Sequence, residues 1–146
     1  MKDPYRVKKK DLQRHAYLEE AGIRRRDCGT NFAREEKWMR DEQRKYGFDR
    51  RETYELGNTF AQWLYEHLRM YLDVSGRVVD LNWDRVQLEG ETMSTREAAQ
   101  HVLWPLEGYF RFRDCWSEEV DGERIAYELL TLAAHRWAEI APAMWW

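Results

Sequence analysis

The sequence predicts a mainly α-helical fold, a single helical domain of four to five helices with a short irregular or β-hairpin insertion around residues 77–93. Apolar residues recur at helical spacing in 58–74, 95–112 and 123–141, and such faces bury themselves against one another. Residues 77–93 interrupt that period, because two short Val- and Leu-containing runs, 78–81 and 85–88, are followed by the turn signal Glu89-Gly90. We therefore expect three main helices around one core, with the insertion between the first two.

The whole chain, 1–146, is expected to form one domain, since two separate cores would each be marginal at this length. A polar, basic helical arm (1–45) should pack on a helical core (46–146). Within the arm, helices are predicted over 8–21 and from about 32 to 45. Neither carries enough apolar surface to be stable alone, so each should lie over the rest of the protein or over a partner.

The core begins with an aromatic turn that leads into a central helix. Asp49, followed three residues later by Glu52, has the pattern of a capping box. Gly57-Asn58 is expected to break or bend the segment that follows. Beyond it the central helix should present one broad apolar face, made of Phe60, Trp63, Leu64, His67, Leu68, Tyr71 and Leu72.

Two further helices complete the expected core. Ser94 and Glu97 form a second capping box at the start of the first of them. Pro105 is expected to kink that helix, because proline lacks the amide hydrogen and clashes with the preceding turn. Pro142 should close the last helix.

Aromatic residues make up 14% of the chain, and eight of them are Trp. Core packing is the favoured interpretation for those at core spacing. The alternative is a cleft of stacking rings that, with nearby arginines, would hold a nucleobase and its phosphates. Two rings at an exposed carboxy terminus would promote aggregation, so we expect the last two to be buried within the monomer or across an interface of a homo-oligomer. The core-spaced set includes Trp63, Tyr65, Tyr71, Trp104 and Trp137, and the predicted oligomer interface is Trp145 and Trp146.

Charge is unevenly distributed along the chain. Residues 1–51 carry a net charge of +6 and residues 52–146 a net charge of −9, within a total of −3. Such asymmetry is typical of a nucleic-acid or acidic-partner surface, or of a basic arm that docks on its own acidic body. Because the basic residues are interleaved with acidic ones, we favour the docking interpretation. Nucleic-acid binding stays possible but is not favoured, since no known binding motif accompanies the basic residues.

The sequence suggests a cytoplasmic protein in a reducing compartment. Its first residues lack the apolar stretch of a signal peptide, and no run without charges approaches the roughly 20 residues that span a bilayer. Cys28 and Cys115 are far apart and unaccompanied by other cysteines. Neither a disulfide framework nor a zinc knuckle is therefore predicted.

No catalytic, cofactor-binding or metal-binding pattern is found in the sequence. The four histidines never fall at metal-ligand spacing, and no Glu-x-x-His, phosphate loop, dinucleotide fingerprint or nucleophile elbow is present. Glu66 and His67 are adjacent on the central helix, so they point about 100° apart and are poorly placed to act on one proton. A hydrogen-bonded core histidine is the favoured interpretation of His67. We expect no catalytic residues, no metal and no cofactor.

Residues 46–74 run from Tyr-Gly-Phe-Asp-Arg-Arg-Glu-Thr to Trp-Leu-Tyr-Glu-His-Leu-Arg-Met-Tyr-Leu, and the chain ends in Pro-Ala-Met-Trp-Trp. Both segments resemble those of a family of small proteins carried by phages and prophages of Gram-positive bacteria, whose members commonly contain YGFDDRETWNLDYTFAxWLYEHLKMYL. The resemblance covers roughly a quarter of the chain and implies no named activity.

What the resemblance implies is a non-enzymatic phage-encoded binding protein made in the host bacterial cell. The expected role is that of an antagonist of bacterial host defence. It would act either as an anti-CRISPR-like inhibitor of a host defence protein or by sequestering an anionic small nucleotide used in signalling. The alternative is an accessory nucleic-acid-associated protein of phage replication or packaging.

The predicted binding residues are Tyr46 and Phe48 of the aromatic turn, Arg50 and Arg51 beside it, and Arg69 from the central helix. The first turn of a helix carries unpaired amides that favour anions, and two adjacent guanidiniums add fork-shaped donors. The opposing interpretation is that nearby carboxylates already cap those amides and pair with both arginines, and the sequence leaves it open.

Overall fold

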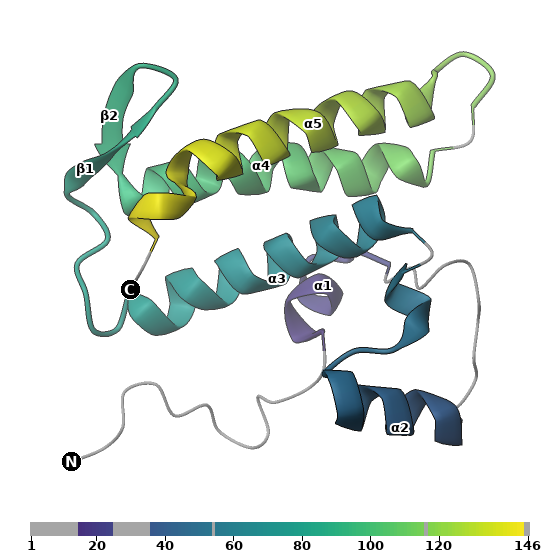
Figure 1. Cartoon of the computed structure of the whole chain (residues 1–146). Coiled ribbons are helices and arrows are strands. Elements are labelled where there is room, and N and C mark those ends of the chain that lie inside the picture. The colour runs from purple at the N-terminus through teal and green to yellow at the C-terminus, as the bar shows by residue number, and fades with distance from the viewer. Residues whose placement is uncertain (1–14, 25–35, 54, 116, 145–146) are drawn as a thin grey trace.

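The computed structural model describes residues 15–24, 36–53, 55–115 and 117–144 of the chain. Its helices and strands confirm the predicted mainly α-helical fold with a small two-stranded hairpin (Figure 1). In chain order they are α1 (Ala16–Glu20), α2 (Lys37–Tyr46), the 3-10 helix η2 (Arg50–Thr53), α3 (Leu56–Ser75), β1 (Asp84–Leu88), β2 (Glu91–Ser94), α4 (Thr95–Arg113), α5 (Gly122–Ile140) and the 3-10 helix η3 (Ala141–Ala143).

Helices α4 and α5 form an antiparallel pair, and α3 packs against α4 (Figure 1). The pair approaches closely at Gly108, where a Cβ atom would lie 2.7 Å from Cδ1 of Leu129. Glycine inside a helix costs about 1 kcal/mol relative to alanine, and here it lets α5 lie against the α4 backbone. Helix α1 packs against α3.

The core lies between α3, α4, α5 and the hairpin. The ring of Tyr65 is fully buried and forms a T-shaped pair with the ring of Phe110, with ring centres 5.8 Å apart and planes at 89°, a favourable geometry for aromatic pairs. Aliphatic side chains from each of these elements fill the remaining space. They include Leu64, Leu68, Leu81, Val86, Leu88, Val102, Leu103, Leu106, Ala126, Ala133 and Ile140.

The hairpin and the start of α4 form as the sequence predicts. Strands β1 and β2 pair antiparallel, with Val86 opposite Met93, and Gly90 takes the left-handed conformation that a tight turn requires (φ 81°). The Ser94 hydroxyl oxygen accepts a hydrogen bond from the amide of Glu97 at 3.1 Å. This is the predicted N-cap, which satisfies one otherwise unpaired amide.

The predicted break at Gly57-Asn58 is wrong, because α3 runs without interruption from Leu56 to Ser75. The Asn58 side chain is buried inside the helix, and its Oδ1 accepts hydrogen bonds from the Tyr109 hydroxyl and the Arg113 guanidinium. Because tertiary partners satisfy this amide, its local preference for turns is overridden. Residues 8–14 and 32–35 of the predicted arm helices, and Trp145 and Trp146, lie outside the described residues.

The predicted broad apolar face of α3 is divided between two sides of the helix. Leu64, Tyr65 and Leu68 point into the core, whereas Trp63 is 47% exposed and its neighbour His67 is also exposed. The core assignment is likewise wrong for Trp104, which is 67% exposed on α4. Tyr71 and Trp137 are partly buried against the core. The apolar face of α3 is divided in this way because apolar residues occupy more than half of the helix circumference, whereas α4 covers only one side of the helix.

We predict that two residues close together on α4 will differ sharply in their effect on stability. Leu106 is fully buried, so Leu106→Ala should lower the free energy of unfolding by about 2–5 kcal/mol. Trp104→Ala removes a larger but mostly exposed side chain, so its effect should stay within about 0.5 kcal/mol. Urea unfolding followed by circular dichroism measures both, and equal losses would contradict this packing.

Candidate functional site

The structure brings four of the five predicted binding residues together, namely Tyr46, Phe48, Arg50 and Arg51. Both arginines, however, form ion pairs with carboxylates of the protein itself. Arg51 donates from Nε to Oδ1 of Asp49 (2.8 Å) and from Nη2 to Oδ2 (2.6 Å). Asp49 is only 1% exposed, and its Oδ2 also accepts from Gln43 Nε2 at 2.7 Å. These hydrogen bonds, with the Arg51 guanidinium as the largest cause, hold the pKa of the Asp49 carboxyl well below its usual range.

Arg50 is paired in the same way, with the carboxylate of Glu42 on α2. Its backbone amide and its Nε each donate to Glu42 at 2.7 Å, and its guanidinium lies 4.8 Å from the ring centre of Trp38. Tyr46 and Phe48 are 58% and 48% exposed, with ring centres 6.2 Å apart. An anion at this place would have to compete with two carboxylates already bound to the arginines.

The predicted capping box at Asp49 is present in a modified form. The Glu52 carboxylate accepts from the Asp49 amide at 3.2 Å, and the Asp49 carboxylate accepts from the Arg51 amide at 3.0 Å. The segment that follows is the 3-10 helix η2 rather than the start of α3. The first-turn amides that were expected to attract an anion are therefore partly occupied by side chains.

Arg69 lies apart from the other predicted binding residues, which all precede α3. The helix begins at Leu56, and Arg69 lies 13 positions further along it, about 20 Å by helical rise. Its Nη1 donates to the Tyr65 hydroxyl at 2.8 Å, and its Nη2 lies 3.3 Å from Oε1 of Glu20 on α1. The single anion site that the sequence suggests is thus divided into two separate places.

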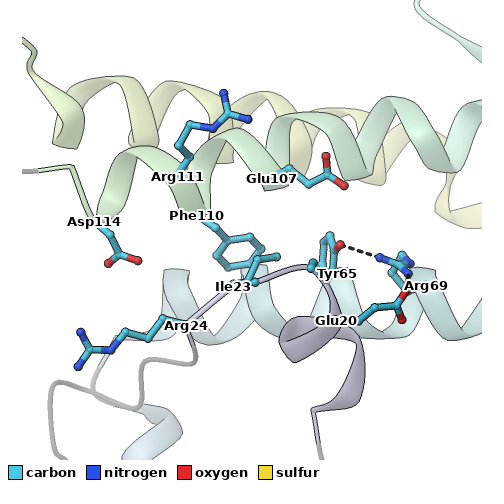
Figure 2. Close-up of a pocket in the computed structure, with 11 residues that line it drawn as sticks. Glu20, Ile23, Arg24, Tyr65, Arg69, Glu107, Phe110, Arg111 and Asp114 are labelled. Carbon is cyan, nitrogen blue, oxygen red and sulfur yellow. Dashed lines mark hydrogen bonds and ion pairs between the residues drawn. The ribbon is translucent and has the colours of Figure 1, made fainter.

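Arg69 instead borders a cavity of about 610 Å³ between α1, α3 and α4 (Figure 2). Tyr65, Arg69 and Glu20 lie toward one end of it, and Arg24 and Asp114 toward the other. The middle of the cavity is apolar, with Ile23 and the edge of Phe110. The full lining is Glu20, Ala21, Gly22, Ile23, Arg24, Tyr65, Arg69, Glu107, Phe110, Arg111 and Asp114.

Charges of both signs surround this cavity in equal number, three arginines and three carboxylates. Glu20 is paired with Arg69, and Asp114 lies 3.4 Å from Nε of Arg113. Glu107 and Arg111 form no ion pair with any other residue that the structure describes. They are one turn apart on the exposed side of α4, a spacing that is common on solvated helix faces, so the sequence contained no signal that singled them out.

The two phenols near the cavity remain protonated at neutral pH. Burial raises the pKa of Tyr65 despite the opposing effect of the Arg69 charge. Burial, with a hydrogen bond to Asp73, raises the pKa of Tyr17 to about 12. At neutral pH both hydroxyls are therefore neutral hydrogen-bonding groups.

A second cavity of about 550 Å³ lies near the connection between α4 and α5. Its lining contains the carboxylates of Glu55, Glu118, Asp121 and Glu123 and one cation, Arg113, whose guanidinium already donates to side chains of α3. The excess of negative charge disfavours an anionic ligand there. Within the described part of the chain, no group of three metal-binding side chains is found, and no helix is long and apolar enough to cross a membrane.

Comparison of the chain with protein families, curated proteins and solved structures finds no match. The resemblance to phage proteins, and the function that it implies, therefore remain predictions from the sequence.

We predict a pH-dependent contribution of Asp49 to stability. Because its pKa is lowered in the folded state, its ion pair stabilises the protein fully above the unfolded pKa of about 3.9, and this stabilisation is lost progressively as pH falls from there toward the lower folded-state pKa. At neutral pH, Asp49→Asn should cost about 1.5–3 kcal/mol. The difference from wild type should shrink as pH falls below about 4, as measured by urea unfolding at each pH. A difference independent of pH would contradict the assignment.

Proposed function

We propose that the protein is a non-enzymatic phage-encoded binding protein that antagonises bacterial host defence by sequestering an anionic small nucleotide in the cavity of Figure 2. The observation that carries this proposal is the cavity itself, whose lining combines three arginines with an apolar middle. Its volume of about 610 Å³ is within the range typical of small-molecule sites. The phage context comes from the sequence resemblance alone.

The mixed charge of the cavity suits a nucleotide better than a simple anion. Guanidiniums donate in a fork that matches phosphate oxygens, and Arg24 and Arg111 supply two forks without a carboxylate partner among the described residues. Carboxylates only accept hydrogen bonds, so Glu107 and Glu20 can receive them from ribose hydroxyls or from an amino group of the base. Ile23 and the edge of Phe110 would contact the apolar part of the base.

Direct inhibition of a host defence protein is the second candidate, and exposed rings favour it. Tyr46, Phe48 and Trp104 are each about half or more exposed and lie outside the cavity. Exposed aromatic side chains are enriched in protein interfaces. A role with nucleic acid is less well supported, because residues 52–146, which form most of the described fold, carry a net charge of −9.

Nucleotide binding is tested by isothermal calorimetry with a panel of linear and cyclic nucleotides, after mass spectrometry of small molecules that the purified protein retains. Replacing Arg24 and Arg111 together by Ala should weaken binding at least about tenfold. The matched control is Arg124→Ala, an exposed arginine on α5 outside the cavity, which should leave affinity unchanged. Retention of no nucleotide together with no heat from any member of the panel would rule out the sequestering role.

The anti-defence role is tested separately, in bacteria that carry nucleotide-signalling defence systems. Expression of the wild-type protein should restore plaque formation by a sensitive phage, and the Arg24→Ala, Arg111→Ala variant should fail to do so. Restoration by the variant as well, in a protein with unchanged circular dichroism, would shift the function to the exposed rings and to a protein target.

A further inference from the structure

Helix α3 carries a second apolar face on the side opposite its buried residues. Its most exposed members are Leu56 (66%), Trp63 (47%) and Met70 (42%). His67 is also exposed, and Phe60 and Val74 are partly buried at its margin. We name this set the outer seam: Leu56, Phe60, Trp63, His67, Met70 and Val74.

The spacing within the outer seam is that of a contact between two helices. Successive members are four, three, four, three and four residues apart, which is the alternation that keeps one stripe of a helix facing a partner helix. No charged residue type falls on the seam, and it extends along nearly all of a helix about 30 Å long. A helix with apolar residues on its solvent side as well as its core side is normally covered on both.

We propose that a second copy of this chain covers the outer seam, with the two α3 helices antiparallel across a two-fold axis. This inference is independent of the proposed function, because the cavity of Figure 2 uses the other side of α3, at Tyr65 and Arg69. In a two-fold interface the same surface of both copies is in contact, so a residue i that meets j of the second copy requires that j meets i. The side chains of the seam must therefore fit the same seam running in the opposite direction.

The outer seam satisfies that requirement when the axis passes midway between Trp63 and His67. Leu56 then lies opposite Val74 of the second copy, Phe60 opposite Met70, and Trp63 opposite His67. Each level pairs a larger apolar or aromatic side chain with a smaller one, which fills space evenly along the contact. A parallel arrangement would instead place the two Trp63 rings at one level and two Val74 side chains at another.

The centre of the seam is already ordered within one chain. The Trp63 and His67 rings stack with centres 4.2 Å apart and planes at 26°, and His67 Nδ1 donates to the Trp63 carbonyl oxygen at 2.6 Å. Two rings held in this way lose little conformational entropy on association. Ordered aromatic side chains at the centre of a patch are the usual anchors of protein interfaces.

Helix α5 adjoins one end of this surface, beside the start of α3. A Cβ atom at Gly57 would lie 3.5 Å from Cδ2 of Leu130, which places α5 beside the start of α3, and Tyr127 on the preceding turn is 69% exposed. A complete aromatic side chain has a surface of roughly 150–250 Å². Because Trp63 is 47% exposed and Tyr127 69% exposed, each of them exposes about 100 Å². A stable interface buries about 800 Å² per partner, so the dimer requires both the seam and the adjoining part of α5.

The oligomeric state in solution tests the proposal. Light scattering of the full chain from low to high micromolar concentration should give a mass approaching twice 17.8 kDa. Replacing Trp63 and Met70 together by Glu should give the mass of one chain, with the dissociation constant raised at least about tenfold. The control Trp104→Glu, at an exposed Trp on α4, should leave the dimer intact. A monomeric wild type, or a dimer that survives the double replacement, would overturn the proposal.

Cross-linking tests the antiparallel register and does not depend on the charged variant being well folded. In a chain with Cys28→Ser and Cys115→Ser, the pair Leu56→Cys and Val74→Cys should form a disulfide between copies under mild oxidation. Leu56→Cys alone should form none, because its two copies lie at opposite ends of the contact. Cross-linking of the single variant, with none gained by the pair, would overturn the antiparallel arrangement.

Discussion

The guanidinium of Arg113 is buried and donates to acceptors from separate segments of the chain. It reaches Asn58 and Gln62 on α3 and the backbone carbonyl of Arg24 after α1, and it lies 5.0 Å from the ring centre of Phe110. A guanidinium removed from water is strongly unfavourable unless its donors are satisfied. The start of α3, the end of α4 and the chain leaving α1 must therefore meet at this point. The cavity beside Phe110 exists because these three segments are held together there.

The two sides of α3 have different physical roles because the helix is apolar on both. The side that meets α4 supplies Leu64, Tyr65 and Leu68 to the core. The side that faces away keeps Trp63 and Met70 at the surface. An exposed apolar stripe has a cost in solubility, and covering it with a second copy removes that cost without disturbing the cavity. Association and ligand binding would thus use opposite sides of one helix.

Charged residues make up 35% of the chain, and several of them form ion pairs that join neighbouring segments. Glu42 of α2 pairs with Arg50 of η2, and Asp49, which pairs with Arg51, also accepts a hydrogen bond from Gln43 of α2. Glu66 pairs with His15, and Glu89 with Arg136, across longer separations in the sequence. Arginines that look available in the sequence are therefore often already engaged. Arg24 and Arg111, which border the cavity, form no ion pair with the described residues and are therefore the better candidates there for an external anion.

The sequence by itself determined the helical fold class, the hairpin and the N-cap at Ser94. These depend on local periodicity, turn residues and capping, which act over a few neighbouring positions. Only the tertiary structure decided which face of α3 is buried, since its apolar residues cover more than one side and the position of α4 selects among them. Gly57-Asn58 remained helical for the same kind of reason, because partners distant in the sequence satisfy the Asn58 amide. The cavity likewise needed three segments to converge, and spacing along one helix carries no information about what lies across from it.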